Sequence, residues 1–244
     1  LAAAVEGGQV QAMLTLTEAG ADPTGLELPL QVAVKCYAQQ GTVRDVRAVH
    51  AILRAQPDAV SEVDEHGDNV LHCALKHARQ PGESIELAGE LVKCCPVACE
   101  STDANGLLPL HIVLSEAPQE LQVKSLVEPI VRAFPGGCEA KTPAGDLPLH
   151  LALRHEASVE IVAMVMQEYV EACAAQDAVG NYPLEYGVEC ETPAAAEIVK
   201  LLRAASTDCE EAIAQALWCA LRTKRWDMVP ILQPTAAVCK MKTS

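Results

Sequence analysis

The sequence predicts an all-α protein built from repeated pairs of helices, and three observations lead to this prediction. A short turn motif recurs along the chain at nearly constant spacing, and apolar residues of helical period follow it. Half of the 244 residues are apolar, yet only 3% are aromatic and Phe134 is the only Phe. Such a core is built from Ala, Leu, Val and Ile, which suits thin layers of closely packed helices.

The repeated turn combines an Asp or Thr, a Gly three residues later, and a Pro-Leu or related pair that opens an apolar run. Its glycines lie 42, 39, 39 and 35 residues apart, at Gly25, Gly67, Gly106, Gly145 and Gly180. We expect each Gly to adopt the positive φ of a tight turn. Pro fits the first position of a helix, where its missing N–H has no partner to lose.

Each turn is followed by two apolar segments separated by a polar break. In the best copy the first segment is short, around residues 149–153, and is expected to be buried on most sides. The second shows a broad stripe at helical spacing from Val159 to Val170, which includes Tyr169. The unit is therefore turn, short helix, loop and longer helix, and it buries its apolar faces by packing on its neighbours.

The stretches of the form Asp-x-x-Gly-x-x-Pro-Leu-His, as in 103–111, resemble ankyrin repeats. The resemblance covers roughly residues 1–205 and implies an ankyrin-type α-solenoid of helix-turn-helix repeats with short β-hairpin or turn fingers. In this family the finger tips and inner helices form a concave face that holds protein partners. The expected boundaries are a partial N-terminal repeat at 1–22, five repeats at 23–63, 64–102, 103–141, 142–176 and 177–205, and a capping helix pair with a tail at 206–244.

The chain departs from the family pattern immediately before the Pro. Ankyrin repeats usually carry a Thr there that caps the inner helix. Here only Asn69 is a capping residue, because the other copies hold Leu28, Leu108, Leu147 and Tyr182. The other copies thus lack the usual capping side chain at the helix start, which bears on the usual hydrogen-bond network and not on the fold.

The C-terminal segment is expected to close the row of repeats. Asp208 and Glu211 predict a capping box that opens a helix running through Trp218 and Leu221. A second, shorter helix is expected from Trp226, broken near its proline. Five cations in this region, Arg222, Lys224, Arg225, Lys240 and Lys242, are interpreted either as a small basic contact patch or as charges near a helix C-terminus and a solvated tail.

Cys and His residues follow the repeat columns and so predict structural roles. Of eleven cysteines none forms a Cys-x-x-Cys pair, and Cys99, Cys138 and Cys173 all lie seven residues before a turn Gly. They are expected to be buried free thiols, which favours an intracellular, reducing compartment. His72, His111 and His150 share one column of the inner helix. We expect no metal and no cofactor.

Composition and motifs favour a protein that binds other proteins and is not an enzyme. The net charge of −15 argues against a nucleic acid partner, and no apolar run is long enough to cross a membrane. Catalytic and phosphate-binding motifs are absent from the sequence. Two other functions stay open: a permanent structural subunit of a large complex, including one peripheral to an organellar membrane complex, and an excised regulatory domain of a larger enzyme or channel.

The residues proposed to contact a partner belong to the turns and to the ends of the inner helices. Those in the turns are His66, Asp68, Asn105, Leu107, Ala144, Asp146, Val179 and Asn181. Those at the helix ends are Lys76, His77, Ser115, Glu116, Arg154 and His155. Solvated surface residues of no function remain the alternative interpretation for this second set.

Overall fold

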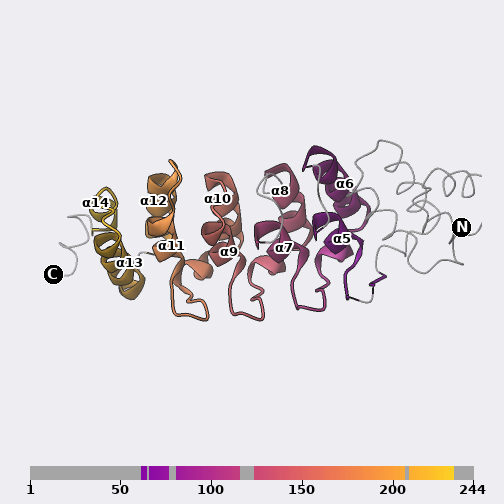
Figure 1. Cartoon of the computed structure of the whole chain (residues 1–244), viewed down its shortest axis with the longest axis horizontal. Coiled ribbons are helices and arrows are strands. Elements are labelled where there is room, and N and C mark those ends of the chain that lie inside the picture. The colour runs from indigo at the N-terminus through magenta and orange to yellow at the C-terminus, as the bar shows by residue number, and fades with distance from the viewer. Residues whose placement is uncertain (1–61, 65, 77–80, 116–123, 207–208, 234–244) are drawn as a thin grey trace, which may run out of the picture. The chain divides into compact units, whose positions relative to one another are not determined.

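The computed structural model describes residues 62–64, 66–76, 81–115, 124–206 and 209–233 (Figure 1). The chain divides into two compact units, Leu1–Gly137 and Cys138–Ser244, and each is described by itself. The described residues are helices and turns without a β-strand, which confirms the all-α prediction for this part of the chain. None of the helices described is both long and apolar enough to cross a membrane.

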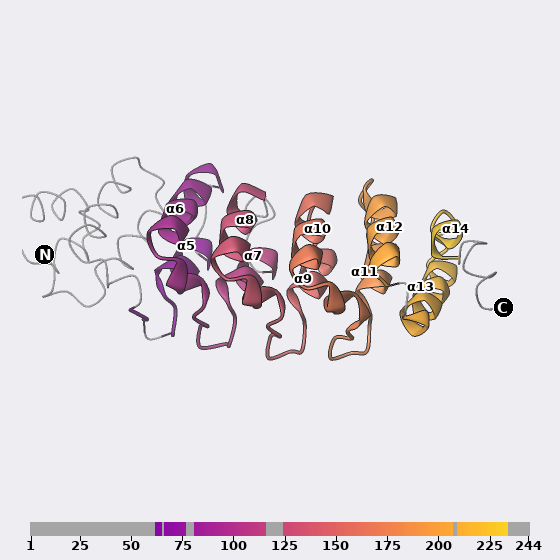
Figure 2. The same ribbon diagram turned by 180° about the vertical axis from the view of Figure 1, so that it is seen from behind.

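The first unit contains two helix pairs. The short helix α5 (Val70–Lys76) is followed by α6 (Pro81–Cys94), and α7 (Pro109–Ser115) is followed by α8 (Lys124–Ala133). The 3-10 turn η3 (Pro96–Cys99) follows α6, and η5 (Pro135–Cys138) follows α8 and ends at the boundary of the unit. Since α5 packs on α7 and α6 packs on α8, the short and the longer helices form two layers (Figures 1 and 2).

The second unit repeats this arrangement and adds a terminal pair. Its elements are α9 (Pro148–Arg154), α10 (Val159–Glu168), the 3-10 turn η6 (Val170–Ala174), α11 (Pro183–Glu189), α12 (Ala195–Ala205), α13 (Glu210–Arg222) and α14 (Val229–Leu232). α11 packs between α9 and α13, and α12 contacts α10 and α14. Each of the ranges 64–102, 103–141, 142–176 and 177–205 thus contains one turn, one short helix and one longer helix.

Aliphatic side chains fill the space between the two layers. The short helices are buried almost entirely, as Leu71, Leu110 and Leu149 illustrate with exposed fractions of 2% or less. The longer helices bury one stripe, which suits surface helices that cover a core. In α6 that stripe is Leu87, Ala88, Leu91 and Val92.

Three sequence predictions about helix ends need correction. α10 ends at Glu168, so Tyr169 is its C-cap and Val170, which opens η6, is 48% exposed. α13 begins at Glu210 with Cys209 as its N-cap, and Asp208 of the predicted capping box lies outside the described residues. α14 begins at Val229, because Pro230 at the start of a helix fits its first turn and does not break it.

Candidate functional site: the turns and their charged bridges

The four described turns share one hydrogen-bond pattern. In the first, the Gly67 N–H donates to the Asp64 carbonyl at 2.9 Å, and the Asp64 N–H donates to the Asp68 carbonyl at 2.9 Å. The same two bonds close the turns at 103–107, 142–146 and 177–181. All four turn glycines have φ between 69° and 96°, as expected for this conformation. The column of glycines therefore corresponds to one repeated turn.

The first residue of each turn also uses its side chain. Asp103 Oδ1 accepts the backbone N–H groups of Asn105 at 2.9 Å and Leu107 at 2.8 Å. Asp64 and Asp177 do the same in their own turns. The Thr142 hydroxyl accepts the Asp146 N–H at 3.1 Å. These acceptors fix the turn by satisfying backbone donors that have no strand partner.

In the first unit, Lys76 links the two turns to each other. Its Nζ donates to Asp68 Oδ1 at 2.7 Å and to Asp103 Oδ2 of the next turn at 2.6 Å. The Asp103 side chain is fully buried and that of Lys76 is 19% exposed. Burial alone would lower the pKa of Lys76, but its hydrogen bonds to Asp103 and Asp68 outweigh this and raise it. Lys76 is therefore a charged bridge between neighbouring turns.

In the second unit, Arg154 takes the corresponding place. Its guanidinium contacts both Asp146 oxygens, at 2.8 and 2.9 Å, and reaches Asp177 Oδ2 of the next turn at 3.3 Å. Tyr186 Oη donates to Asp177 Oδ2 at 2.6 Å and accepts from Arg154 at 2.9 Å. The guanidinium carbon also lies 5.1 Å from the centre of the Tyr186 ring. Such a bidentate, stacked arrangement requires Arg and is not available to Lys.

The repeat between these bridges has no such charged pair. Leu107 stands where Asp68 and Asp146 stand, and Ser115 stands where Lys76 and Arg154 stand. Ser115 Oγ donates to the His111 carbonyl at 2.7 Å inside its own helix. Of the three described short helices that contain the repeated His, α5 and α9 therefore end in a residue that forms a charged bridge, and α7 does not.

The structure places the proposed contact residues in different environments. Asp68 and Asp146 are buried, and with Lys76 and Arg154 they are engaged in the bridges described above. Leu107, Asn181, Ser115 and His155 are partly exposed. His77 and Glu116 lie outside the described residues. The turn-tip residues, which directly precede each turn Gly, are exposed: His66, Asn105, Ala144 and Val179.

Neighbouring turn tips lie side by side within each unit. The Ala104 N–H donates to the His66 carbonyl at 3.1 Å, which joins the two turns of the first unit. In the second unit, a Cβ placed on Gly145 would lie 3.1 Å from the Ala178 Cβ. In both ribbon views the two turns of each unit extend to the same side of its helices (Figures 1 and 2). Each unit therefore presents a pair of adjacent tips.

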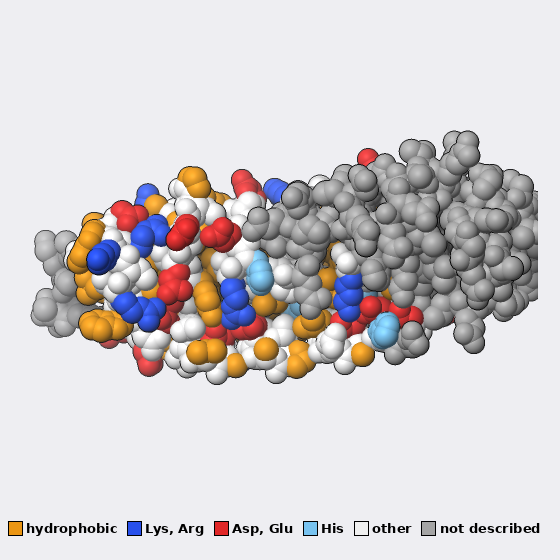
Figure 3. Space-filling model, viewed as in Figure 1, with side chains coloured by type: hydrophobic (Ala, Val, Ile, Leu, Met, Phe, Trp, Pro, Cys, Tyr) orange, Lys and Arg blue, Asp and Glu red, His pale blue; other side chains and the backbone are white. Residues whose placement is uncertain are grey.

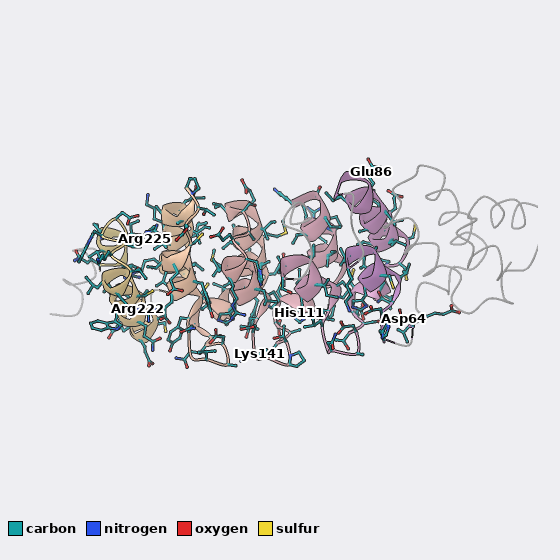
Figure 4. All side chains as sticks on the ribbon, in the orientation of Figure 1. Asp64, Glu86, His111, Lys141, Arg222 and Arg225 are labelled. Atoms are coloured by element: carbon teal, nitrogen blue, oxygen red, sulfur yellow. The ribbon has the colours of Figure 1, made fainter. Side chains whose placement is uncertain are left out.

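The repeated His residues bond to the start of their own short helices, and His72 and His150 also reach the segment that leads into or forms the next turn. His72 Nδ1 accepts the Asn69 N–H at 3.1 Å, so its proton is on Nε2, which donates to the Leu107 carbonyl at 3.2 Å. His150 Nδ1 likewise accepts the Leu147 N–H at 3.2 Å, and its Nε2 contacts the carbonyl of Ala175, just before the next turn, at 3.1 Å. His111, labelled in Figure 4, accepts the Leu108 N–H at 3.1 Å. Asn69 also caps α5, as predicted, through N–H groups at 2.9 and 3.0 Å.

The buried histidines predict a loss of stability in weak acid. Burial lowers the pKa of His72 and of His150 below the ordinary value of 6.5, more than nearby carboxylates raise it. The folded state therefore binds fewer protons than the unfolded state, and the stability that each His contributes is full above pH 6.5 and lost as the pH falls toward its folded pKa. We expect the free energy of unfolding to fall by up to about 1.4 kcal/mol per pH unit for each His in this window.

Urea unfolding at pH 7.5 and 5.5 measures this slope, and a His72→Gln, His150→Gln variant tests its origin. Gln at this helix position keeps an acceptor for the backbone N–H but does not titrate. Its slope should be clearly smaller, whereas His66→Gln at an exposed tip should leave the slope unchanged. An equal slope in the double variant would assign the acid sensitivity to other groups.

The buried cysteines are as the repeat columns predicted. Cys99, Cys138 and Cys173 are at most 1% exposed. Burial raises the pKa of Cys99 and Cys138 to about 12 and that of Cys173 to about 11, so these thiols are uncharged at neutral pH. They pack as small apolar groups. Neutral thiols of this kind are poor nucleophiles and poor metal ligands.

One group of side chains has the composition of a metal site. Ligand atoms of Asp64, Asp68 and Cys73 lie within 4.8 Å of one another. The Asp68 carboxylate is already neutralised by Lys76 Nζ, and Asp64 Oδ1 already accepts two backbone N–H groups. A cation there would compete with the ammonium group, so the cluster is best explained by the charged bridge.

The described turns thus combine a repeated, internally bonded frame with accessible tips whose identity changes from copy to copy. Sequence reasoning missed Tyr186 and the inter-turn role of the first Asp. The signal for the latter was present, since an Asp opens three of the four described turns. No protein-family model matches this chain, and no curated protein matches it significantly in sequence.

Proposed function

We propose that this chain is a non-enzymatic, ankyrin-type scaffold that binds partner proteins through its turn tips. The observation that carries the proposal is the contrast between frame and tip. The turn closure, the Gly conformation and the His bonds recur from copy to copy. The tips carry His66, Asn105, Ala144 and Val179, which share no chemistry and are exposed.

A repeated frame with variable tips suits recognition better than catalysis. Catalysis needs groups with mutually tuned protonation arranged around a reacting atom. The ionised side chains at these turns are instead neutralised by one another, as Lys76 and Asp103 are. Exposed side chains such as Val179, which is 82% exposed, are available for contact without disturbing these bonds. In a repeat fold, the residues that are the same in every copy stabilise the stack, and the residues that differ between copies can bind partners.

Two further features support the ankyrin-type interpretation. The turn closure combines an i to i+3 bond with a positive-φ Gly next to a bonded pair, which is the geometry of a short hairpin loop. Proline opens α7, α9 and α11, with a Leu and a His or Glu behind it. We infer that the turns are the finger elements of an ankyrin-type solenoid. The buried neutral thiols support a reducing, intracellular compartment.

A permanent structural subunit remains the second candidate, and the exposed Trp residues favour it. Trp218 is 71% exposed and Trp226 is 63% exposed. Obligate interfaces are more apolar than transient ones, and unpaired apolar faces destabilise a lone subunit in solution. This candidate predicts that the turn tips contribute less to binding than the C-terminal helices do.

Partner capture with matched variants tests the proposal. The full chain is immobilised as wild type, as His66→Ala with Asn105→Ala, and as Ala144→Arg with Val179→Arg. Lys93→Ala and Ala204→Arg, on exposed positions of α6 and α12, are the controls. Bound proteins are quantified by mass spectrometry after folding has been checked by circular dichroism.

We expect a set of proteins retained by wild type and by both controls, and reduced about ten-fold or more by at least one tip variant, since a few contact residues dominate most interfaces. If every tip variant retains the wild-type set, the tips are not the binding surface. If the set is lost instead when Trp218 is replaced, the permanent-subunit candidate is preferred.

A further inference from the structure

The outer face of α13 exposes apolar side chains between the charged residues at its two ends. Its inner face buries Ala212, Ala216 and Ala220 against the rest of the unit. Its outer face carries what we term the α13 stripe, Ala214, Trp218 and Leu221, at helical spacing. Trp218 is 71% and Leu221 44% exposed, so this side of the predicted closing helix faces solvent. The last helix of a packed row normally has a polar outer face.

The stripe is held on a rigid support. Arg225 Nη1 donates to the Val188 and Cys190 carbonyls at 3.1 and 2.7 Å, which fastens the end of α13 to the end of α11. Arg222 contacts Glu189 at 3.0 Å (Figure 4 labels both arginines). The exposed apolar residues therefore belong to a preformed surface. Large exposed apolar residues gathered on such a surface indicate an interface.

Acidic and basic residues lie at opposite ends of the α13 stripe. Glu211 is exposed in the first turn of α13, and Lys224 is exposed just past its last turn. Figure 3 shows Lys and Arg side chains beside hydrophobic ones over the C-terminal helices. The stripe is thus acidic at one end and basic at the other. A partner helix that lies antiparallel and carries the same order of charges would match it at both ends.

A second copy of α13 meets this requirement by symmetry. Residues 211 and 224 lie at equal distances from the midpoint between residues 217 and 218, and so do residues 214 and 221. In an antiparallel pair centred there, Glu211 of each copy lies at the end of the stripe to which Lys224, just past the C-cap Thr223, brings the charge of the other copy. The small Ala214 faces the large Leu221, and the two Trp218 rings lie near the centre. Such self-complementarity is what a two-fold interface demands.

We propose that the α13 stripe is a homodimer interface in which two chains pack α13 antiparallel about a two-fold axis. Trp and Arg are the residue types that dominate binding energy at interface centres. The net charge of −15 makes two copies repel each other at long range, so the matched charges at the ends of the stripe set the register against that repulsion. This surface is distinct from the turn tips and leaves them available.

Sedimentation of the full chain over a wide concentration range, at about physiological ionic strength, tests the proposal. We expect a concentration-dependent shift from 25.9 kDa to twice that mass. The sequence holds only two Trp residues, Trp218 and Trp226. Trp emission should therefore shift to shorter wavelength over the same concentrations, because it reports on this region alone.

Five variants locate the interface. Trp218→Ser should raise the dissociation constant at least ten-fold, and Val97→Ser, at another exposed apolar residue, should not change it. Glu211→Lys and Lys224→Glu should each weaken the dimer several-fold, since each places like charges opposite each other at both ends. The double charge swap should restore it. Circular dichroism confirms that each variant folds, as expected for exposed positions.

Every result decides the question. A chain that stays at 25.9 kDa up to its solubility limit overturns the proposal, and a dimer that tolerates Trp218→Ser also does so. The antiparallel register is overturned if Trp218→Ser abolishes the dimer but the double charge swap does not restore the affinity lost in Glu211→Lys and Lys224→Glu. Restoration by the swap supports the two-fold pairing of α13.

Discussion

Gly67→Ala is expected to lower the free energy of unfolding by about 3 kcal/mol, a large effect for a surface turn. At its φ of 69°, a side chain costs about 1–2 kcal/mol. A Cβ at this position would also lie 2.7 Å from the Ala104 backbone nitrogen. That nitrogen belongs to the bond between the two turns of the unit, and backbone cannot rotate away as a side chain does. Loss of this bond adds about 1 kcal/mol.

Substitutions at two other glycines distinguish the cost of the positive φ at Gly67 from the cost of its close contact with Ala104. Gly180 has a φ of 96° but no atom near its Cβ position, so Gly180→Ala should cost only the conformational strain. Gly89 lies inside α6 with open space around it, so Gly89→Ala should stabilise the protein by about 0.5–1 kcal/mol. Urea unfolding followed by circular dichroism measures all three. Equal losses for Gly67→Ala and Gly180→Ala would show that the approach of Ala104 contributes nothing.

The repeated frame was predictable because its causes are local. A Gly at positive φ, a Pro at a helix start and a capping Asn69 each depend on a few neighbouring residues, and the structure confirms these features. The cysteine column was predictable for a related reason: Cys alternates there with Val, so the position must be apolar. Burial of Cys99 and Cys138 confirms this.

The charged bridges could not be predicted, because their partners are distant in sequence. Lys76 and Asp103 are 27 residues apart, and Arg154 and Asp177 are 23 apart. Sequence reasoning identified Lys76 and Arg154 as exposed contact candidates, since both follow an inner helix. Whether a long cationic side chain points to solvent or to the next turn depends on how neighbouring repeats pack within a unit.

The exposed Trp residues show a different limit of sequence reasoning. Helical periodicity identifies an apolar stripe, but a helix at the end of a row has two faces, and the pattern does not say which face is covered. α13 covers its alanine face and exposes Trp218. The small residues of α13 pack closely against α11 on its inner face, and the large Trp218 ring therefore lies on the outer face.

Asp177→Ala is the other substitution with a large expected effect, a loss of about 3 kcal/mol in the free energy of unfolding. Asp177 Oδ1 accepts the N–H groups of Val179, Gly180 and Asn181, each at 2.9 Å. Its other oxygen accepts from Tyr186 and Arg154. The side chain is fully buried, so its removal leaves the Val179 and Asn181 N–H groups without this acceptor and Arg154 with one carboxylate fewer. An unsatisfied buried donor costs about 1–3 kcal/mol, and a charged donor costs more.

Asp177→Thr divides this loss into its two parts, because Thr142 already occupies the same position in the preceding turn and accepts a turn N–H there. Thr should keep part of the backbone bonding and lose the carboxylate, at a cost of about half that of Ala.

The two variants of Asp177 should also differ from wild type in how their stability depends on acid pH. Burial raises the pKa of Asp177, but its bonds to Tyr186 and the turn outweigh this and hold it below 3.8. Its contribution is therefore full above pH 3.8 and lost as the pH falls through its folded pKa. Both variants should lack this part of the acid unfolding curve. If Thr proves as costly as Ala, the carboxylate's bridge to Arg154 and Tyr186, and not the turn, stabilises this part of the unit.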